Sequence, residues 1–384
     1  MSRPDVTLIT PFPALGERHG GWTGVASYSA NLAGALTSAG ACVTVLAAAE
    51  PGQPAVANDG GLEVRRVWKR GPGALPGAAA AALATGAPTV HIQHELFLYG
   101  GPAAVPGIVP ALATLRRRRA VVTMHHVVDP SAVDTAFTAT HRVRAPAAVA
   151  RAGVAAVQRT IAALADTVVV HEPSFASVVP GAAVVPHGIE TPERSADRAA
   201  VRAELGVAAD RLCVLCFGFL APYKGLEAAI GAGRLADDAV ELVIAGGEHP
   251  RLAGDGYADG LRASAPPNAR FTGYIADADV ARWFAAADVA LLLYPRPFAA
   301  SGPLALALAH GTPVLLSDAL ARTVGAPDTL AVGTDPVIIA ARLEALARHP
   351  EERERLGSAA ATLTAGRSWP EIARRHLDLY GGAP

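Results

Sequence analysis

The clearest sign of chemistry in this chain is a turn of small residues that opens an apolar helix. Ser301, Gly302 and Pro303 precede a helix that we expect over residues 303–310, and Gly311 follows it as a left-handed cap. A helix that begins at a glycine leaves its first backbone N–H groups free, and the helix dipole attracts a phosphate to that end. The turn is therefore a candidate phosphate site, although Ser301 as the simple cap of a core helix explains the same residues equally well.

Lys224 supplies the cation that a phosphate site needs. The chain has only two lysines, Lys69 and Lys224, among its 33 lysine and arginine residues. Lys224 lies in the loop 218–225, which has a glycine at each end and follows an expected strand at 212–217. An ammonium group there can meet a phosphate as a point charge. A surface lysine without a ligand is the alternative.

Polar side chains also follow two expected strands of the first half. The strand at 89–93 leads to His94 and Glu95, and the strand at 120–124 leads to His125 and His126. Open α/β sheets bind ligands at the carboxyl ends of their strands, so these residues are candidate site residues. Glu95 would act as a base if it faced an acceptor, and an ion-paired or capping glutamate is the alternative. For each histidine the alternative is a partly buried ring bound to a loop.

A glycine-rich loop follows the first expected strand, which covers residues 6–10. The loop 16–24 contains Trp22 and Gly24 and leads into a helix expected over 25–36. A strand, a glycine loop and a helix in this order let the backbone approach an anionic ligand closely. The loop lacks the GxGxxG pattern, so a dinucleotide site is not supported.

Strands and helices alternate through both halves of the chain, and we expect all strands to be parallel. The polar stretch 190–202 reads as the linker between the halves. The prediction is an α/β protein with two facing Rossmann-like, doubly wound domains and a cleft between them. The expected domains are an N-terminal acceptor-side domain (1–190), a C-terminal donor domain (191–367) and a final helical segment (368–384).

Composition limits the classes of function. The formal net charge of −1 argues against a nucleic-acid-binding protein. Three cysteines and no charged-then-apolar leader point to the cytoplasm, and no membrane-spanning run is expected. Arg144, Arg151 and Arg159 are expected on one exposed helix face, which keeps a peripheral membrane contact open. The alanine- and arginine-rich composition is typical of a bacterial source of high GC content.

Ordered landmarks over nearly the whole chain resemble the retaining glycosyltransferases of family 4, which have the GT-B fold. The landmarks are the segments 20–36, 123–125, 184–188, 217–225, 245–246, 271–274 and 301–314, with a final helix at 369–380. The resemblance implies transfer of a hexose-type sugar from a UDP- or GDP-linked donor to a small-molecule or glycan acceptor, with retention and without a metal or other cofactor. We expect a monomer or a homodimer.

The resemblance also assigns roles to residues. It places Lys224 on the pyrophosphate, with Gly24 near the phosphates of the donor and Tyr274 along its nucleobase. It places His125 beside the donor sugar and the reacting carbon. The turn that would bind the diphosphate through its amides consists of Ser301, Gly302, Pro303 and Leu304. The acceptor is expected near Trp22, His94 and His126.

Three positions depart from the family pattern. Phe298 and Leu306 occupy places where the family usually has glutamates, and Phe219 occupies the place of an arginine. His310 or Arg296 could stand in for the missing carboxylates. The departures keep two alternatives open: a nucleotide-sugar epimerase or hydrolase on the same fold, and a degenerate, non-catalytic partner subunit.

Overall fold

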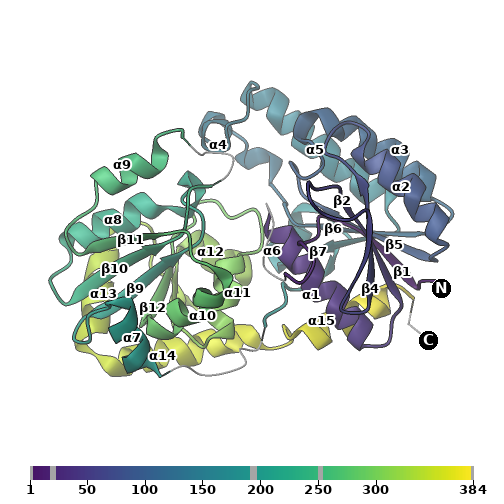
Figure 1. Ribbon diagram of the computed structural model, residues 1–384. Coiled ribbons are helices and arrows are strands. Elements are labelled where there is room, and N and C mark those ends of the chain that lie inside the picture. Colours follow the sequence, from purple (N-terminus) through teal and green to yellow (C-terminus); the bar gives the residue numbers. More distant parts are fainter. Residues whose placement is uncertain (1–2, 18–22, 191–196, 250–253, 382–384) are drawn as a thin grey trace. The chain divides into compact units, whose positions relative to one another are not determined.

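The computed structural model describes residues 3–17, 23–190, 197–249 and 254–381, and Trp22 lies outside them. The chain forms two compact units. The first comprises residues 1–188, 298–300 and 366–384, and the second comprises residues 189–297 and 301–365. The predicted α/β class with two Rossmann-like sheets is confirmed (Figure 1).

The first unit is built on an eight-stranded sheet in the order β3-β4-β2-β1-β5-β6-β7-β8. Its strands are β1 (Val6–Ile9), β2 (Val43–Ala48), β3 (Val56–Asp59), β4 (Leu62–Trp68), β5 (Thr89–His94), β6 (Arg119–Met124), β7 (Thr167–Val170) and β8 (Ala183–Val184). All pair in parallel except β3, which forms an antiparallel hairpin with β4. The expectation of a wholly parallel sheet was therefore wrong at this edge, where Gly60 and Gly61 at positive φ make a tight turn between β3 and β4.

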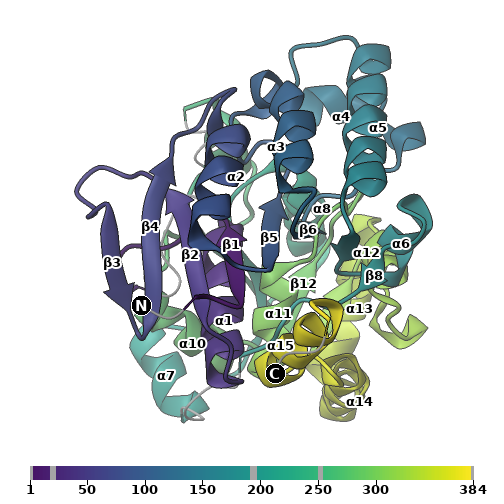
Figure 2. The ribbon, with the colours of Figure 1, turned by 90° about the vertical axis from the view of Figure 1, so that its right-hand side faces the viewer.

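Helices cover both faces of this sheet (Figure 2). They are α1 (Gly24–Ser38), α2 (Ala74–Thr85), α3 (Ile108–Leu115), α4 (Thr135–Thr140), α5 (Ala147–Leu164), α6 (Pro173–Val178) and α15 (Trp369–Leu379). One apolar core lies where α2, α3 and α5 meet the sheet, and the other lies where α1 and α15 pack together. Strands buried on both faces explain the near-continuous apolar runs of β1 and β2.

The final helix α15 is seated on α1 by aromatic packing. The Trp369 ring lies 5.3 Å from the ring of Tyr28, centroid to centroid. A Cβ atom on Gly188 would lie 2.5 Å from the Trp369 ring, which no real side chain tolerates. Gly188 therefore gives α15 the room to approach the first unit.

Among the described helices, α5 alone is long and apolar enough to cross a membrane, judged by length and composition. The absence of a membrane span stays a prediction, because length and composition alone do not show that a helix crosses a membrane. The helix packs on α3 and β7 in the first unit, and it exposes Arg151 and Arg159 on the other side. Arg144 precedes the helix rather than sharing its face.

The second unit has a wholly parallel five-stranded sheet in the order β11-β10-β9-β12-β13. Its strands are β9 (Leu212–Phe217), β10 (Val240–Ala245), β11 (Ala269–Gly273), β12 (Val289–Leu292) and β13 (Val314–Leu316). Its helices are α7 (Arg198–Leu205), α8 (Leu226–Leu235), α9 (Tyr257–Ala263), α10 (Asp277–Ala286), α11 (Gly302–Ala309), α12 (Asp318–Val324), α13 (Pro336–Arg348) and α14 (Pro350–Ala361). The expected linker at 190–202 ends earlier than predicted, because Asp197 caps α7 through the backbone N–H of Ala199.

Candidate active site

The strand order of the second unit defines where a ligand should bind. β9 is the first strand of this sheet, and its neighbours β10 and β12 continue the chain in opposite directions across the sheet. Open α/β sheets bind ligands at such a switch point, beyond the carboxyl ends of the strands. Lys224 follows β9, whereas Tyr294 and Ser301 follow β12. The residues predicted to bind phosphate therefore flank the switch point.

Lys224 and the Ser301 turn meet through Tyr294. The Nζ atom of Lys224 donates a hydrogen bond of 2.6 Å to the hydroxyl of Tyr294 and lies 4.5 Å from the centre of that ring. The Ser301 hydroxyl donates to the same Tyr294 oxygen over 3.2 Å. The Ser317 hydroxyl in turn donates to the backbone carbonyl of Tyr294 over 2.6 Å and fixes this residue at the end of β12. The geometry joins an ammonium, a phenol and a serine at one place.

The ammonium of Lys224 has no carboxylate partner within the described parts of the chain. Its surroundings desolvate the charge and lower the pKa of Lys224, and the nearby Tyr223 opposes this effect. A cation in such surroundings is stabilised when an anion takes the place of the lost water. This is the electrostatic property of a phosphate site rather than of a structural ion pair.

Glycines leave the space in which a ligand would sit. Gly218 has φ +113°, and a Cβ atom there would lie 3.3 Å from both the Lys224 Nζ and the Pro303 ring. Gly246 has φ +158°, and a Cβ atom there would lie 2.0 Å from the carbonyl oxygen of Gly218. Gly302 has no atom within 4 Å of the corresponding position, so the start of α11 opens onto free space.

The turn itself offers fewer amides than its sequence suggests. Ser301 caps α11, because its hydroxyl accepts the backbone N–H of Leu304 over 3.1 Å. Pro303 has no N–H, and the side chain of Leu304 is buried in the core of the second unit. The amides that the helix does not use are those of Ser301 and Gly302. Both the capping and the phosphate interpretations of Ser301 are thus compatible with one geometry.

The remaining predicted donor residue of this unit lies at the end of β11. Tyr274 is 72% exposed, and its Cβ lies 3.4 Å from the Cβ position of Gly247, which follows β10. A large aromatic ring exposed beside a glycine loop is suited to stacking on a flat ligand.

Leu306 packs against the apolar core, and His310 stacks on Phe284 at 5.5 Å, so neither supplies a carboxylate-like group at the turn.

The first unit places a second polar group at its own switch point, between β1 and β5. Thr23, at the start of α1, donates its hydroxyl to Oε2 of Glu95 over 3.3 Å. The Nε2 atom of His126 lies 3.9 Å from the same oxygen. Gly24 begins α1 beside Thr23 and has open space where a Cβ would be. Glu95, His126 and Thr23 form a cluster that could orient or deprotonate a hydroxyl group.

His125 lies in a buried network on the other side of this edge. Its Nε2 lies 2.8 Å from Oε1 of Gln93, and its Nδ1 lies 3.2 Å from Nε2 of His171. The ring is 7% exposed, and Tyr28 covers it edge-on at 4.8 Å. Both ring nitrogens therefore meet protein atoms, unlike those of a histidine that presents a free nitrogen to a substrate.

The protonation of this network can be deduced from its acceptors. The Val185 carbonyl can only accept, so Nδ1 of His171 carries a proton, and a neutral His171 leaves Nε2 as an acceptor. Nδ1 of His125 must then donate, which leaves Nε2 to accept a hydrogen bond. Burial and the neighbouring histidines hold the pKa of His125 well below its usual value and favour this neutral form. A neutral network therefore turns the NH₂ group of Gln93 toward His125, because an amide oxygen there would require an extra proton.

His94 takes no part in the hydrogen-bond network of His125, although the nearby His126 adds to the lowering of its pKa. Its ring borders an internal cavity of about 10 Å³ together with Leu75, Ile108 and Leu112. Burial lowers the pKa of His94 to about 4. The structure thus places this predicted acceptor-side residue in the apolar core between β5 and the helices α2 and α3. Phe298 also packs within the first unit, with its ring 4.9 Å from His126 and 4.8 Å from His141.

Sequence reasoning did not single out Tyr294, Gln93 or Thr23. Tyr294 and Thr23 come directly after or before elements that carried predicted site residues, so their position at a strand or helix end was the available signal. Gln93 alternates with His91 along β5 and shares its face. No group of three or more metal-ligating side chains occurs in the described ranges.

Residues 211–349 match the family model described as Glycosyl transferases group 1. This segment is similar to the group 1 glycosyl transferases, and we call it the group 1 domain. The domain runs from β9 to α13 and contains Lys224, Tyr274, Tyr294 and the Ser301 turn. The predicted recognition of a glycosyltransferase is confirmed for this segment.

Solved structures match the whole chain, including the part outside the group 1 domain. Sucrose-phosphate synthase from Thermosynechococcus elongatus has a TM-score of 0.75 and 20% identity, covering 99% of this chain and 98% of its own. HepE from Anabaena, in complex with UDP and glucose, has a TM-score of 0.71 and 15% identity, covering 99% and 100%. WaaG, a glycosyltransferase involved in lipopolysaccharide biosynthesis, has a TM-score of 0.66 and 16% identity, covering 98% and 100%. These TM-scores and coverages show that the chain shares the GT-B fold. No curated protein matches the chain significantly in sequence.

Proposed function

We propose that this protein is a retaining glycosyltransferase that transfers a hexose-type sugar from a nucleotide diphosphate sugar to an acceptor hydroxyl. The proposal rests on the Lys224 ammonium, which has no carboxylate partner in the described parts of the chain. It lies beside Tyr294 and the Ser301 turn, at the switch point of the group 1 domain. A UDP-linked donor is the favoured class, since HepE crystallises with UDP, with UDP and glucose, and with UDP-glucose.

The proposed chemistry follows from the negative charge of the leaving group. As the bond from the anomeric carbon to the donor phosphate breaks, negative charge accumulates on the diphosphate. The Lys224 ammonium, the Tyr294 hydroxyl and the free amides of the turn are fixed donors for this charge. In this scheme the protein supplies the cation itself, so the transfer needs no metal. Tyr274 stacks on the nucleobase.

The first unit is proposed to serve the acceptor. Glu95, oriented by Thr23 and near His126, accepts a hydrogen bond from the attacking hydroxyl. His125 is proposed to act on the donor-sugar side through the rigid loop that its network fixes, with its two ring nitrogens held by Gln93 and His171. A cytoplasmic location, and an acceptor that is a small molecule or glycan, complete the proposal.

Nucleotide binding tests the donor half directly. UDP, GDP and TDP are titrated by calorimetry against the unmodified protein, Lys224→Ala and Lys69→Ala. Because hydrogen bonds to charged groups contribute about 1.5–3 kcal/mol, Lys224→Ala should weaken the favoured nucleotide roughly 10- to 100-fold. Lys69 is exposed and lies in the other unit, so Lys69→Ala is the matched control and should bind normally. If none of the three nucleotides binds, the proposal fails.

A degenerate partner subunit is a second candidate, favoured by the apolar side chains at Phe298 and Leu306. The products distinguish the candidates. A transferase forms an α- or β-glycoside only when an acceptor is present, and proton NMR reports whether the anomeric configuration is retained. An epimerase or hydrolase consumes donor without an acceptor. A partner subunit binds nucleotide without turning over any donor, and chelation by EDTA tests independence from metal.

A further inference from the structure

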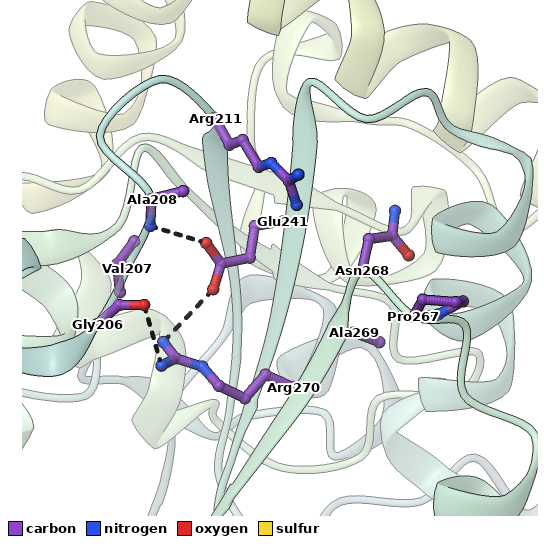
Figure 3. Close-up of a pocket in the computed structure, with 9 residues that line it drawn as sticks. All are labelled: Gly206, Val207, Ala208, Arg211, Glu241, Pro267, Asn268, Ala269 and Arg270. Carbon is purple, nitrogen blue, oxygen red and sulfur yellow. Dashed lines mark hydrogen bonds and ion pairs between the residues drawn. The ribbon is translucent and has the colours of Figure 1, made fainter.

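A pocket lies in the second unit near the amino ends of β9, β10 and β11. Residues 206–208, Arg211, Glu241 and 267–270 line a cavity of about 360 Å³ (Figure 3). Arg211 directly precedes β9, whereas the candidate donor residues follow its other end. The six residues of β9 span roughly 20 Å at about 3.3 Å per residue, so the two sites are separate. We call this cavity the amino-edge pocket.

One guanidinium group of the amino-edge pocket is held rigidly. Nη1 of Arg270 donates to the carbonyl of Leu205 over 2.7 Å, and the guanidinium carbon lies 5.2 Å from the centre of the Trp283 ring. Nη2 of Arg270 forms an ion pair of 3.5 Å with Glu241, whose other oxygen accepts the backbone N–H of Ala208 (Figure 3). These contacts fix the orientation of Arg270 before any ligand arrives.

The second guanidinium group has no protein partner. Arg211 extends over the amino-edge pocket toward Glu241 in Figure 3, and no hydrogen bond or ion pair within the described ranges engages its side chain. The lining carries two guanidinium groups, those of Arg211 and Arg270, and one carboxylate, that of Glu241. Its net charge is therefore +1. Such a lining favours an anion, and guanidinium groups suit phosphate oxygens.

Polar atoms beside the amino-edge pocket are also left without partners. Nε of Arg270 and Oδ1 of Asn268 are buried and make no hydrogen bond. A buried polar group without a partner costs about 1–3 kcal/mol, and a ligand offsets that cost when its binding shifts the lining and opens these atoms to it. The acceptor oxygen of Asn268 calls for a hydroxyl donor, and the cavity volume exceeds that of a single phosphate group.

We propose that the amino-edge pocket binds a small phosphate ester that carries hydroxyl groups. The phosphate lies against Arg211 and Arg270, and the hydroxyl-bearing carbon chain fills the space toward Asn268. This ligand is distinct from the donor, because it binds at the other end of the strands. The proposal does not depend on the transferase activity of the protein.

The test uses glycerol 3-phosphate as the probe, with glycerol and inorganic phosphate as reference ligands. Calorimetry gives the affinity, and hydrogen exchange measured by mass spectrometry locates the site. We expect glycerol 3-phosphate to protect 206–211 and 267–270 and to bind more tightly than either reference ligand. Arg211→Ala should weaken binding at least tenfold, whereas Arg322→Ala, which removes an exposed arginine of the same unit, should leave it unchanged.

A second variant is expected to strengthen binding, so its result cannot be explained by loss of folding. Glu241→Gln removes the competing negative charge and keeps an oxygen for the Ala208 amide, so glycerol 3-phosphate should bind several-fold more tightly. The proposal is overturned if no probe binds, if Arg211→Ala binds normally, or if protection appears only at 218–225. Equal affinity for glycerol would overturn the anion requirement, and equal affinity for inorganic phosphate would overturn the hydroxyl requirement.

Discussion

The Nζ atom of Lys224 and the hydroxyl of Tyr294 lie 2.6 Å apart, although they follow different strands and are 70 positions apart in sequence. This hydrogen bond crosses the switch point of the second sheet and connects the lysine to the Ser301 turn. The contact gives the lysine a fixed position before an anion binds.

Replacing Tyr294 by phenylalanine should separate positioning from charge. Tyr294→Phe keeps the ring beneath the ammonium but removes the oxygen that Lys224 and Ser301 share. We expect nucleotide affinity to fall roughly fivefold, corresponding to about 1 kcal/mol for one hydrogen bond, and less than in Lys224→Ala. Calorimetric titration measures the loss, with Tyr257→Phe as a control in the same unit. An effect as large as that of Lys224→Ala would mean that the phenol, rather than the charge, dominates binding.

Gly218 should be intolerant of a side chain for two separable reasons. In Gly218→Ala the Cβ meets Lys224 and Pro303, and the positive φ adds strain of about 1–3 kcal/mol. Gly325 has φ +67° with no atom near its Cβ position, so Gly325→Ala carries strain alone. We expect both variants to lose stability in urea unfolding, whereas only Gly218→Ala loses nucleotide binding. Normal binding by Gly218→Ala would show that the ligand does not use this space.

The buried histidines of the first unit should make the fold sensitive to acid. Burial lowers the pKa of His376 and His94 to about 4 and that of His171 to about 3. Below about pH 6.5 the unfolded chain binds protons at these residues and the folded chain does not, so stability falls with falling pH. Each such histidine removes up to about 1.4 kcal/mol per pH unit between pH 6.5 and its folded pKa.

Urea unfolding between pH 7.5 and 5 measures this dependence. His376→Phe removes one buried imidazole and should reduce the slope of stability against pH by up to one proton. His349 is exposed in the second unit, so His349→Asn is the control and should leave the slope of the first unit unchanged. A slope that is the same in both variants and in the unmodified protein would contradict the assignment of neutral buried rings.

Gly188 should govern the seating of α15. In Gly188→Ala the new methyl group would lie 2.5 Å from the Trp369 ring, so the helix must shift away from α1. Hydrogen exchange of residues 369–379 should accelerate strongly. Gly153 lies within α5 with open space around its Cβ position, and Gly153→Ala should instead stabilise the protein by about 0.5–1 kcal/mol. Unchanged exchange in Gly188→Ala would mean that α15 does not depend on this contact.

The sequence was sufficient to locate those candidate-site residues whose position depends on local pattern. The glycines at both ends of the loop 218–225 pointed to Lys224, and the helix cap pointed to Ser301. Both signals are local, because the end of a strand and the start of a helix depend on residues that are neighbours in sequence. Tyr294 was not foreseen, because its role depends on pairing between β9 and β12, which lie far apart along the chain.

The position of His94 could have been predicted from the alternation of side chains along β5. Side chains alternate along a strand, so His91 and Gln93 face α1 and α15 whereas Ile92 and His94 face the core under α2 and α3. The carboxyl end of a strand therefore did not by itself bring His94 to the site. The hairpin of β3 was missed for a different reason, since Val56–Asp59 is too short and polar to stand out as a strand.

The return of α15 to the first unit also bears on how the chain is made. Tyr28, Gly188 and the Val6-containing core are synthesised early, yet the surface that α15 covers stays exposed until the entire second unit has left the ribosome. The unit that begins the chain is thus the last to be completed. Its apolar α1 face stays uncovered during translation, and fragments that stop before Trp369 are expected to aggregate.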